Sequence, residues 1–323
     1  MSISVIVSNF NGERFLTKLL DSLYAQKKVN IEIIIVDRNS TDSSLEVLKK
    51  YSEVKIIQEP PETGNVSGYT KGIQLAQKDK FFFCNEDLYL DENCLYYLES
   101  SIDLKKKICA ADPWQWTYDG KHLIHGATYF EKVIWAIESS YGFRYYNFIS
   151  QPQEGNVIPF ACAGAFLIDK NIFFEAGGWD TSFFMSNEDV DLFTRIWQRD
   201  LICISVPQAK VYHAVGATDN YVVNKMTVKK RRYISLYSST SLIPVKYFSL
   251  KYVWLAFLSY FVRFIRNLVK FRFRMLYWDL LVLQDFFSNL PHCMKFRSKN
   301  SKWNKKKPGQ LFFTYHKFQK QKH

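Results

Sequence analysis

The sequence predicts an α/β protein with a doubly wound sheet, followed by a helical region at the C-terminal end. Short β-branched runs alternate with segments of helical apolar spacing, and polar clusters follow three of these runs. A break in charge after residue 226 marks the second region. The chain has 323 residues, of which 47% are hydrophobic, so a sizeable core can form and a disordered or collagen-like chain is excluded.

Strands and helices alternate over the first 84 residues. The predicted strands are Ile3–Ser8, Ile31–Asp37, Val54–Gln58 and Lys80–Cys84. The predicted helices cover the apolar spacing from Phe15 to Leu23, then Ser43–Lys50 and Ser67–Gln77. Because such sheets bind ligands beyond the carboxyl ends of their strands, the polar residues directly after each strand are the candidates for a site.

Three polar clusters stand at these strand ends: Ser8–Asn11, Asp37–Asp42 and Asn85–Asp87. For any one cluster, turn chemistry is the commoner explanation. The three together converge on one edge of one sheet. No glycine-rich phosphate loop accompanies them, which argues against dinucleotide dehydrogenases and P-loop enzymes and leaves recognition by side chains and a metal ion.

The cysteine pattern and the start of the chain bear on the compartment. Six cysteines are spread singly with no C-x-x-C pair, so we expect reduced thiols in a cytosolic setting rather than a zinc ribbon or a redox motif. Residues 1–7 run straight into a strand pattern, so we expect no signal peptide.

Six stretches carry a family resemblance by their order and spacing. They are SVIVSNFNGERFLTKLLDSLYAQ, IEIIIVDRNSTDSS, ETGNVSGYTKGIQLA, FFFCNEDLYLDENCL, GAFLIDKNIFFEAGGWDTSFFMSNEDVDLFTR and VYHAVGAT. Over about residues 1–220 the chain resembles the inverting family-2 glycosyltransferases of the GT-A fold, nearest to bacterial rhamnosyltransferase-like enzymes. The resemblance implies a mixed sheet and a GT-A domain over residues 1–226. About 1–110 would form its Rossmann-like nucleotide-sugar half and 111–226 its acceptor half.

The resemblance implies a nucleotide pocket at the ends of the first two strands. Asp37 would contact the base or the ribose, as a carboxylate at a strand end can accept hydrogen bonds from either. The residues that would complete the pocket are Ser8, Asn9, Asn39 and Gly68, the last within the Gly64–Gly72 loop and helix. The sequence departs from the family pattern at Arg38 and Thr70.

Asn85-Glu86-Asp87 stands where the family carries its D-x-D signature. The resemblance implies that Asp87 bridges to a metal ion and that Asn85 lies near the donor sugar. His213 follows a predicted strand at Leu201–Val206 and a predicted turn at Pro207. A single histidine in such a place is more often a core residue than a metal ligand. The family resemblance, however, implies that His213 is the second ligand of the metal ion. Hard oxygen ligands suit Mg²⁺ or Mn²⁺ held mainly through substrate phosphates.

Three acids, Glu188, Asp189 and Asp191, open a predicted amphipathic helix. From the residues alone, helix-dipole acids and catalytic acids are equally good interpretations. The resemblance implies that Asp189 is the general base, that Glu188 holds the acceptor or orients the base, and that Trp179 and Asp180 line the acceptor pocket.

Residues 227–323 contain 21 Lys and Arg but only two acids, Asp279 and Asp285. If Tyr247–Met275 is helical, a stripe of four cations, Arg263, Arg266, Lys270 and Arg274, predicts an interfacial helix at an anionic membrane surface. Only eleven uncharged residues separate Lys251 from Arg263, too few for a spanning helix. Ordinary packing helices with a solvated Lys-rich end are the alternative.

The leading hypothesis is a metal-dependent, inverting transfer of a sugar from a nucleotide sugar to a glycan or lipid-linked acceptor. We expect a role in cell-surface polysaccharide synthesis and a cytoplasmic, peripheral location at the inner face of the cell membrane. The alternative is a catalytically inactive GT-A-like protein that binds glycan or membrane, which the replacement of an acid by Asn85 favours. No nucleic-acid partner is expected, because the basic end carries no recognition motif beyond its charge.

Overall fold

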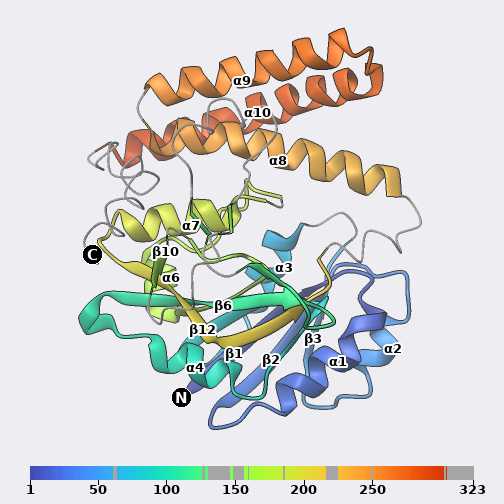
Figure 1. The fold of residues 1–323 in the computed structure, drawn as a ribbon, viewed down its shortest axis with the longest axis vertical. Coiled ribbons are helices and arrows are strands. Elements are labelled where there is room, and N and C mark those ends of the chain that lie inside the picture. The colour runs from blue at the N-terminus through green and yellow to red at the C-terminus, as the bar shows by residue number, and fades with distance from the viewer. Residues whose placement is uncertain are drawn as a thin grey trace. The chain divides into compact units, whose positions relative to one another are not determined.

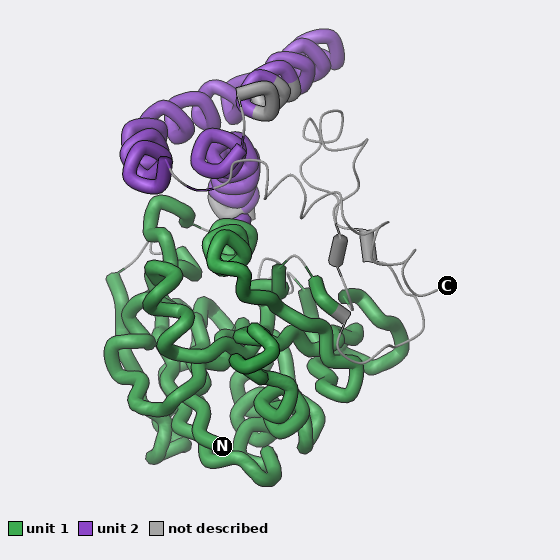
Figure 2. The backbone as a smooth tube through the Cα atoms, turned by 90° about the vertical axis from the view of Figure 1, so that its left-hand side faces the viewer, with its two compact units in different colours: residues 1–128, 147–184, 188–225 green, residues 129–146, 185–187, 226–323 purple. Residues whose placement is uncertain are grey.

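The structure is a computed structural model that describes residues 1–60, 64–125, 128–129, 146–147, 156–158, 160–184, 186–215, 225–248, 250–301 and 303. The chain divides into two compact units, coloured separately in Figure 2. The first comprises residues 1–128, 147–184 and 188–225, and the second comprises residues 129–146, 185–187 and 226–323.

The first unit is built around one mixed sheet (Figure 1). Its strands are β1 (Ser2–Asn9), β2 (Asn30–Asp37), β3 (Lys55–Gln58), β4 (Lys80–Asn85), β5 (Leu88–Leu90), β6 (Ile108–Thr117), β7 (Leu123–His125), β10 (Asn156–Ile158), β11 (Ala165–Asp169) and β12 (Ile202–His213). A separate pair joins β8 (Thr128–Tyr129) to β9 (Tyr146–Asn147). The helices are α1 (Glu13–Tyr24), α2 (Ser44–Leu48), α3 (Asn65–Ile73), α4 (Cys94–Ser101), α6 (Lys170–Glu175) and α7 (Glu188–Trp197), with a 3₁₀ turn η1 (Leu104–Lys106).

The sheet runs in the order β10-β12-β6-β11-β4-β1-β2-β3. Strands β1 to β4 pair in parallel, whereas β11 is antiparallel to both β4 and β6. The predicted doubly wound, mixed sheet is therefore confirmed. The alternating N-terminal strands and helices form the parallel half of the sheet. The chain that follows adds β11, which is antiparallel to its two neighbours.

Alternation along β1 explains why helices cover both faces of the sheet. Ile3, Val5 and Val7 point to one face and join a core with the leucines of α1 and α4. Ile6 points to the other face, where Gly72 of α3 lies against it. An added Cβ at Gly72 would stand 2.4 Å from the Ile6 side chain, so α3 can pack this closely only with glycine there.

Several predicted boundaries differ from the structure. Helix α2 ends at Leu48 instead of Lys50. Helix α3 covers Asn65–Ile73, so it begins two residues before and ends four residues before the predicted Ser67–Gln77. The predicted turn at Pro207 is wrong, because β12 continues through it to His213. The register against β6 shifts between Val206 and Lys210, and such an irregularity accommodates a proline that cannot donate to the ladder.

The second unit is helical, with α8 (Lys225–Tyr247), α9 (Leu250–Val269) and α10 (Phe273–Lys299). These helices meet at the carboxylate of Asp279, which is fully buried. It accepts hydrogen bonds from Tyr233 of α8 at 2.7 Å, and from Arg263 and Asn267 of α9 at 2.9 Å each. The Arg263 guanidinium also lies 3.9 Å from the ring centre of Tyr237.

This arrangement corrects the predicted stripe of four cations. Helix α9 ends at Val269, so Lys270 follows it and Arg274 belongs to α10. Arg263 is buried against Asp279 instead of facing outward. A buried carboxylate needs a paired cation, and α9 turns its polar side inward to supply one.

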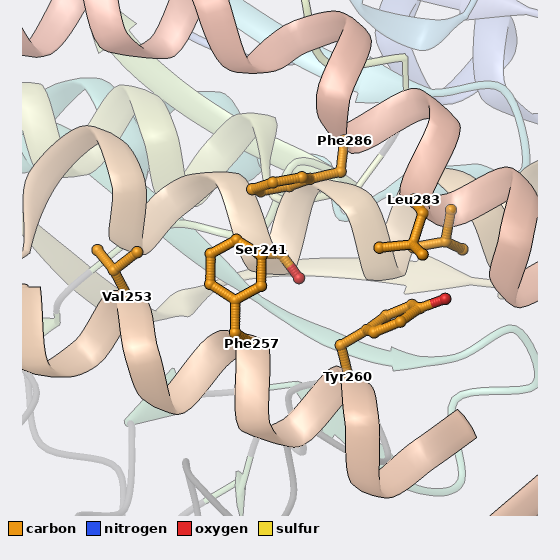
Figure 3. A pocket seen from close by; sticks show the side chains of 7 residues that line it. Ser241, Val253, Phe257, Tyr260, Leu283 and Phe286 are labelled. Carbon is orange, nitrogen blue, oxygen red and sulfur yellow. The ribbon is translucent and has the colours of Figure 1, made fainter. Parts of the chain in front are cut away.

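An apolar pocket lies between these three helices (Figure 3). Its lining residues are Ser241, Val253, Phe257, Tyr260, Val282, Leu283 and Phe286. The Ser241 hydroxyl donates to Tyr237 O at 3.0 Å, and the Tyr260 hydroxyl donates to Asp279 O at 2.8 Å. Since both hydroxyl protons are engaged by backbone carbonyls, the pocket presents an apolar surface.

We predict that Arg263→Met lowers the free energy of unfolding by about 3 kcal/mol, because it leaves the Asp279 charge buried without its cation. Arg272→Met makes the same replacement at an exposed position and should change stability by less than about 0.5 kcal/mol. Urea unfolding of the full chain, followed by circular dichroism, measures both. Equal destabilisation by the two variants would contradict the role of the buried pair.

Candidate functional site

The ends of β1, β2 and β4 bring the predicted nucleotide residues together. Asn9 lies beside Asp37 in the β1–β2 register, and Ser8 lies beside Asn85 in the β1–β4 register. The Asn9 amide donates to Asp37 Oδ2 at 2.7 Å, and Ser40 N donates to Asp37 Oδ1 at 2.9 Å. The carboxylate of Asp37 is therefore fixed in place before any ligand binds.

Gly68 of α3 covers this edge. A Cβ at this position would stand 2.5 Å from Ser8 Oγ, so glycine permits the close approach of α3 to β1. Ser8 Oγ and Asn9 Oδ1 are both buried without a hydrogen-bond partner. Buried polar atoms without partners are costly, and a ligand's polar groups would satisfy them.

The pair predicted to bind metal, Asp87 and His213, is brought together although 125 residues lie between the two in sequence. Strand β5 follows Asp87 and pairs antiparallel with β12, which places Leu88 opposite His213. The backbone bond from Ala214 N to Asp87 O, at 2.9 Å, extends this pairing. As a result, His213 Nε2 lies 2.9 Å from Asp87 Oδ1.

The orientation of these two side chains fits a bound cation. His213 Nδ1 lies 2.9 Å from Gln115 Oε1, which can only accept, so in the neutral ring Nε2 presents a lone pair to Asp87. Asp87 Oδ1 is buried, and the short contact to His213 lacks the alignment of a hydrogen bond. A cation beside these two electron-pair donors would satisfy both of them, so the residues fit a divalent metal.

The protein would supply only two of the ligands of such a metal ion. Within the described residues, no group of three or more His, Cys, Asp or Glu side chains could hold a metal ion by itself. Mg²⁺ and Mn²⁺ commonly bind through one or two protein ligands together with substrate phosphates and water. Asp87 and His213 match that pattern, in which the ion arrives with the substrate.

A short backbone segment, Cys162–Gly164, links the metal pair to Asp189. Gly164 O accepts from Asn85 N at 3.0 Å, and a Cβ on Gly164 would stand 3.1 Å from His213 Cε1. Ala163 N donates to Asp189 Oδ2 at 3.1 Å. The segment therefore connects the end of β4 to the first turn of α7.

Tyr69 connects the middle residue of the same segment, Ala163, to Asn85. Its hydroxyl lies 3.0 Å from Asn85 Oδ1 and 3.3 Å from Ala163 O, while its ring stacks on Trp179 with centroids 5.7 Å apart. Asp189 and Asn85 are thus linked through the backbone of one residue, Ala163, and the side chain of Tyr69. The predicted base and the predicted donor-sugar residue belong to one connected site.

Asp189 has the environment of a base that works near neutral pH. Burial raises the pKa of its carboxyl to about 6, while hydrogen bonds from Ala163 and Val190 and the charge of His125 oppose the rise. His125 Nε2 in turn lies 2.8 Å from Asp112 Oδ2, and Asp112 Oδ1 accepts from Cys162 N at 3.1 Å. The Asp112–His125 pair therefore reaches Asp189 through the same segment.

The four other residues predicted for the site, Glu188, Trp179, Asp180 and Asn39, differ in burial and in hydrogen bonding. Glu188 is buried next to Asp189. Trp179 lies among core aromatic rings, and its indole Nε1 is buried without a hydrogen-bond partner. Asp180 accepts from Ser182 N at 2.9 Å and so closes a turn. Asn39 is exposed, in a left-handed backbone conformation with φ of 59°.

Sequence reasoning missed Arg38 and gave Glu86 no role. Burial raises the pKa of Glu86 to about 8, the charge of Asp87 adds to the rise, and the Arg38 guanidinium opposes it. Arg38 is itself buried and thus adds a cation among these acids. The available signal was its departure from the family pattern directly after Asp37. Tyr69 and Gln115 were missed as well, and only Tyr69 stood in a quoted motif.

Comparison with known proteins identifies the chain. The family described as Glycosyl transferase family 2 matches residues 4–175, more than half of the sequence. The chain belongs to glycosyltransferase family 2. The transferase assignment predicted from its motifs is therefore confirmed.

Curated relatives of this family-2 glycosyltransferase match only part of it. Poly(ribitol-phosphate) beta-N-acetylglucosaminyltransferase TarS of Staphylococcus aureus is 33% identical over 110 residues, which are 32% of this chain and 19% of TarS. Poly(ribitol-phosphate) beta-glucosyltransferase of Bacillus spizizenii is 34% identical over 102 residues, 29% of this chain and 16% of that protein. The matched stretches thus span less than a fifth of these relatives.

Solved structures show the same fold at low identity. The mannosyltransferase PcManGT of Pyrobaculum calidifontis, in complex with GDP-Man and Mn²⁺, has a TM-score of 0.53 at 13% identity over 89% of this chain and 86% of its own. GalNAc-T7 with UDP, GalNAc and Mn²⁺ has a TM-score of 0.54 at 17% identity over 66% of this chain and 44% of its own. The predicted GT-A fold is confirmed.

Proposed function

We propose that this family-2 glycosyltransferase moves a sugar from a nucleoside diphosphate sugar to an acceptor hydroxyl with inversion at the anomeric carbon, using Asp189 as the general base. One observation carries the proposal: Asp189, buried and with a pKa raised to about 6, is joined through Ala163 to the strand edge that holds Asn85. A carboxylate with this pKa is deprotonated at neutral pH and still basic enough to take a proton from a hydroxyl as the hydroxyl attacks.

Residues 1–226 carry this reaction in our proposal, with about 1–110 as the donor half and 111–226 as the acceptor half. Asp37, held by Asn9 and Ser40, accepts hydrogen bonds from the base or the ribose. The partner-free Ser8 Oγ and Asn9 Oδ1 support a polar ligand at this edge. Asn39 and Gly68 complete the donor pocket, and Asn85, held by Tyr69, faces the donor sugar.

Asp87 and His213 hold Mg²⁺ or Mn²⁺ together with the diphosphate. The ion, when bound, neutralises negative charge on the departing nucleoside diphosphate. The chain's own part is to align the two ligands, since Gln115 orients His213 and the β5–β12 pairing positions Asp87. Solved GT-A neighbours that contain Mn²⁺ and a nucleotide support a divalent ion here.

The transfer is a single displacement. The acceptor oxygen bonds to the anomeric carbon, the bond from that carbon to the diphosphate oxygen breaks, and the acceptor proton passes to Asp189. Glu188 and Asp180 hold the acceptor, and the partner-free indole N–H of Trp179 supplies a donor for one of its hydroxyls. The acceptor is a glycan or a lipid-linked glycan of cell-surface polysaccharide synthesis. The overall family resemblance suggests a rhamnosyl donor, and UDP-hexoses are the alternative.

The proposed location is cytoplasmic, peripheral at the inner face of the cell membrane. Residues 227–323 support it, because their 21 Lys and Arg against two acids suit an anionic surface. Within the described residues, no helix has the length and apolarity needed to cross a bilayer.

Asp189→Asn should lower transfer by about two to four orders of magnitude while nucleotide affinity persists, because the amide keeps the shape but cannot take the proton. Product formation with a panel of nucleotide sugars, together with calorimetric titration of the nucleotides, measures the two effects separately. Asp21→Asn makes the same replacement at an exposed carboxylate of α1 outside the three polar clusters and is the matched control. Near-normal transfer by Asp189→Asn would refute the assignment.

The rate of transfer should rise with pH through about 6 and then level off, since only the carboxylate form of Asp189 can accept a proton. The positive charge of His125 lowers the pKa of Asp189, so His125→Asn should move this rise to higher pH. Measured pH profiles of kcat/KM for the two proteins test both statements. A flat profile between pH 5 and 8 (roughly one pH unit below and two above the expected midpoint) would oppose them.

Asp87→Ala and His213→Ala should weaken Mn²⁺-dependent binding of nucleoside diphosphates and leave metal-free binding nearly unchanged, because both side chains act at the diphosphate end. Calorimetric titration with UDP, dTDP and GDP, with Mn²⁺ or with a chelator, measures the difference. His122→Ala, at an exposed histidine, serves as control. Unchanged Mn²⁺-dependent affinity in both variants would remove them from the metal site.

A further inference from the structure

Among the α9 side chains that the structure describes, most of the large apolar ones are exposed and two polar ones are buried. Arg263 and Asn267 are buried at Asp279, whereas a stripe of large apolar side chains is exposed, from 39% at Phe257 to 71% at Trp254. The stripe consists of Trp254, Phe257, Leu258, Phe261, Val262, Ile265, Leu268 and Val269. These positions recur every three or four residues, so they form one continuous face, which we call the α9 face.

Cations and aromatic rings alternate at the turn from α9 to α10. Phe271 and Phe273 are 76% and 68% exposed, with ring centroids 6.4 Å apart. Lys270, Arg272 and Arg274 separate and flank them, and all three are exposed. Phe271 holds a left-handed backbone conformation with φ of 50°, which is unfavourable for a bulky residue. We call Lys270–Arg274 the basic turn.

The α9 face and the basic turn together require a partner that is both apolar and anionic. Exposed apolar patches of this extent are unusual on a protein without a partner. Helix α9 has no acidic residue, and Asp279, the nearest acid in α10, is buried. A second copy of the chain would bring a second set of cations, and residues 304–323 add six lysines and no acid. Like charges oppose both of these occupants.

We infer that α9 lies in the plane of an anionic lipid bilayer, with the α9 face in the acyl boundary and the basic turn against the headgroups. Trp254 and the paired phenylalanines suit the depth at which aromatic rings concentrate. The apolar pocket shares Phe257 with the α9 face and so adds apolar surface beside it. This inference deepens the proposed membrane-side location and in that respect rests on the proposed function.

The test is co-sedimentation of the full chain with phosphatidylcholine vesicles and with vesicles of equal parts phosphatidylcholine and phosphatidylglycerol. Donor and acceptor are omitted, so failure of lipid binding is distinguished from failure of transfer. Lys270→Gln, Arg272→Gln and Arg274→Gln together should lower partitioning into the mixed vesicles on the order of 100-fold. Folding of each variant is checked by circular dichroism.

A matched charge control exists in the first unit. Lys105, Lys106 and Lys107 are three consecutive exposed lysines beside the exposed Leu104. Replacing all three by Gln removes the same charge but should leave partitioning within roughly threefold, because these lysines lie outside the proposed contact. Equal losses in this control and in the basic-turn variant would show unspecific charge attraction and overturn the inference.

The apolar contribution is tested at high salt, which screens the cations but not the burial of side chains. Leu258→Gln with Phe261→Gln should abolish the binding that survives high salt, because glutamine keeps helix propensity while removing apolar area. The matched control is Leu104→Gln with Phe174→Gln, two exposed side chains of the first unit. Salt-resistant binding that persists in the α9 variant would overturn the inference.

Two results would assign the α9 face to another occupant and also overturn the inference. One is a dimer, seen by light scattering, that Leu258→Gln with Phe261→Gln dissociates while the original chain binds no vesicles. The other is vesicle binding that appears only after removal of residues 304–323, which would mean that the chain's own end occupies the face. Neither is expected, because both occupants add positive charge.

Discussion

The site depends on the conformation of one backbone segment, Cys162–Gly164, more than on any side chain. Its peptide groups bond to Asp112, Asp189, Tyr69 and Asn85, which come from a central strand, a helix start, a covering helix and a strand end. Each bond uses a main-chain N–H or C=O of the segment, so the side chains of the segment can vary but its backbone conformation cannot. Gly164 adds one steric condition, because a Cβ there would press on His213. A displacement of this segment would therefore move the base and the metal pair together.

The two units handle buried charge in opposite ways. In the second unit, Asp279 meets a cation and two neutral donors at hydrogen-bonding distance, which makes it a structural centre. In the first unit, Glu86, Asp87, Asp112 and Asp189 are all buried near one edge. Burial raises the pKa of Glu86 to about 8, with the charge of Asp87 adding to the rise, and it raises the pKa of Asp189 to about 6; Arg38 and His125 oppose these rises only in part. Such raised pKa values are characteristic of sites built for ligands and proton transfer.

Sequence reasoning located residues whose placement follows from periodicity. Asn9, Asp37 and Asn85 end neighbouring strands of a sheet, so their convergence could be predicted once the strands were recognised. Ala163 could not be found in this way, because a peptide group that bonds to Asp189 leaves no side-chain signature. Pro207 was taken for a turn because proline ends most ladders, yet an irregularity in β12 absorbs it. Arg263 was placed outward because helix cations usually are, and only its spatial neighbour Asp279 reveals the reverse.

The order of the strands also has a consequence for synthesis of the chain. Strand β4, with Phe81, Phe82 and Phe83, has β1 on one side and β11 on the other. Its first partner precedes it in the chain, but β11 begins only at Ala165. While the intervening 79 residues emerge from the ribosome, an aromatic strand has an open edge, and such edges pair readily with other chains. At elongation rates of about 5 to 20 residues per second this interval lasts on the order of 4 to 16 seconds, and Lys80 places a positive charge at the start of the strand that has the open edge.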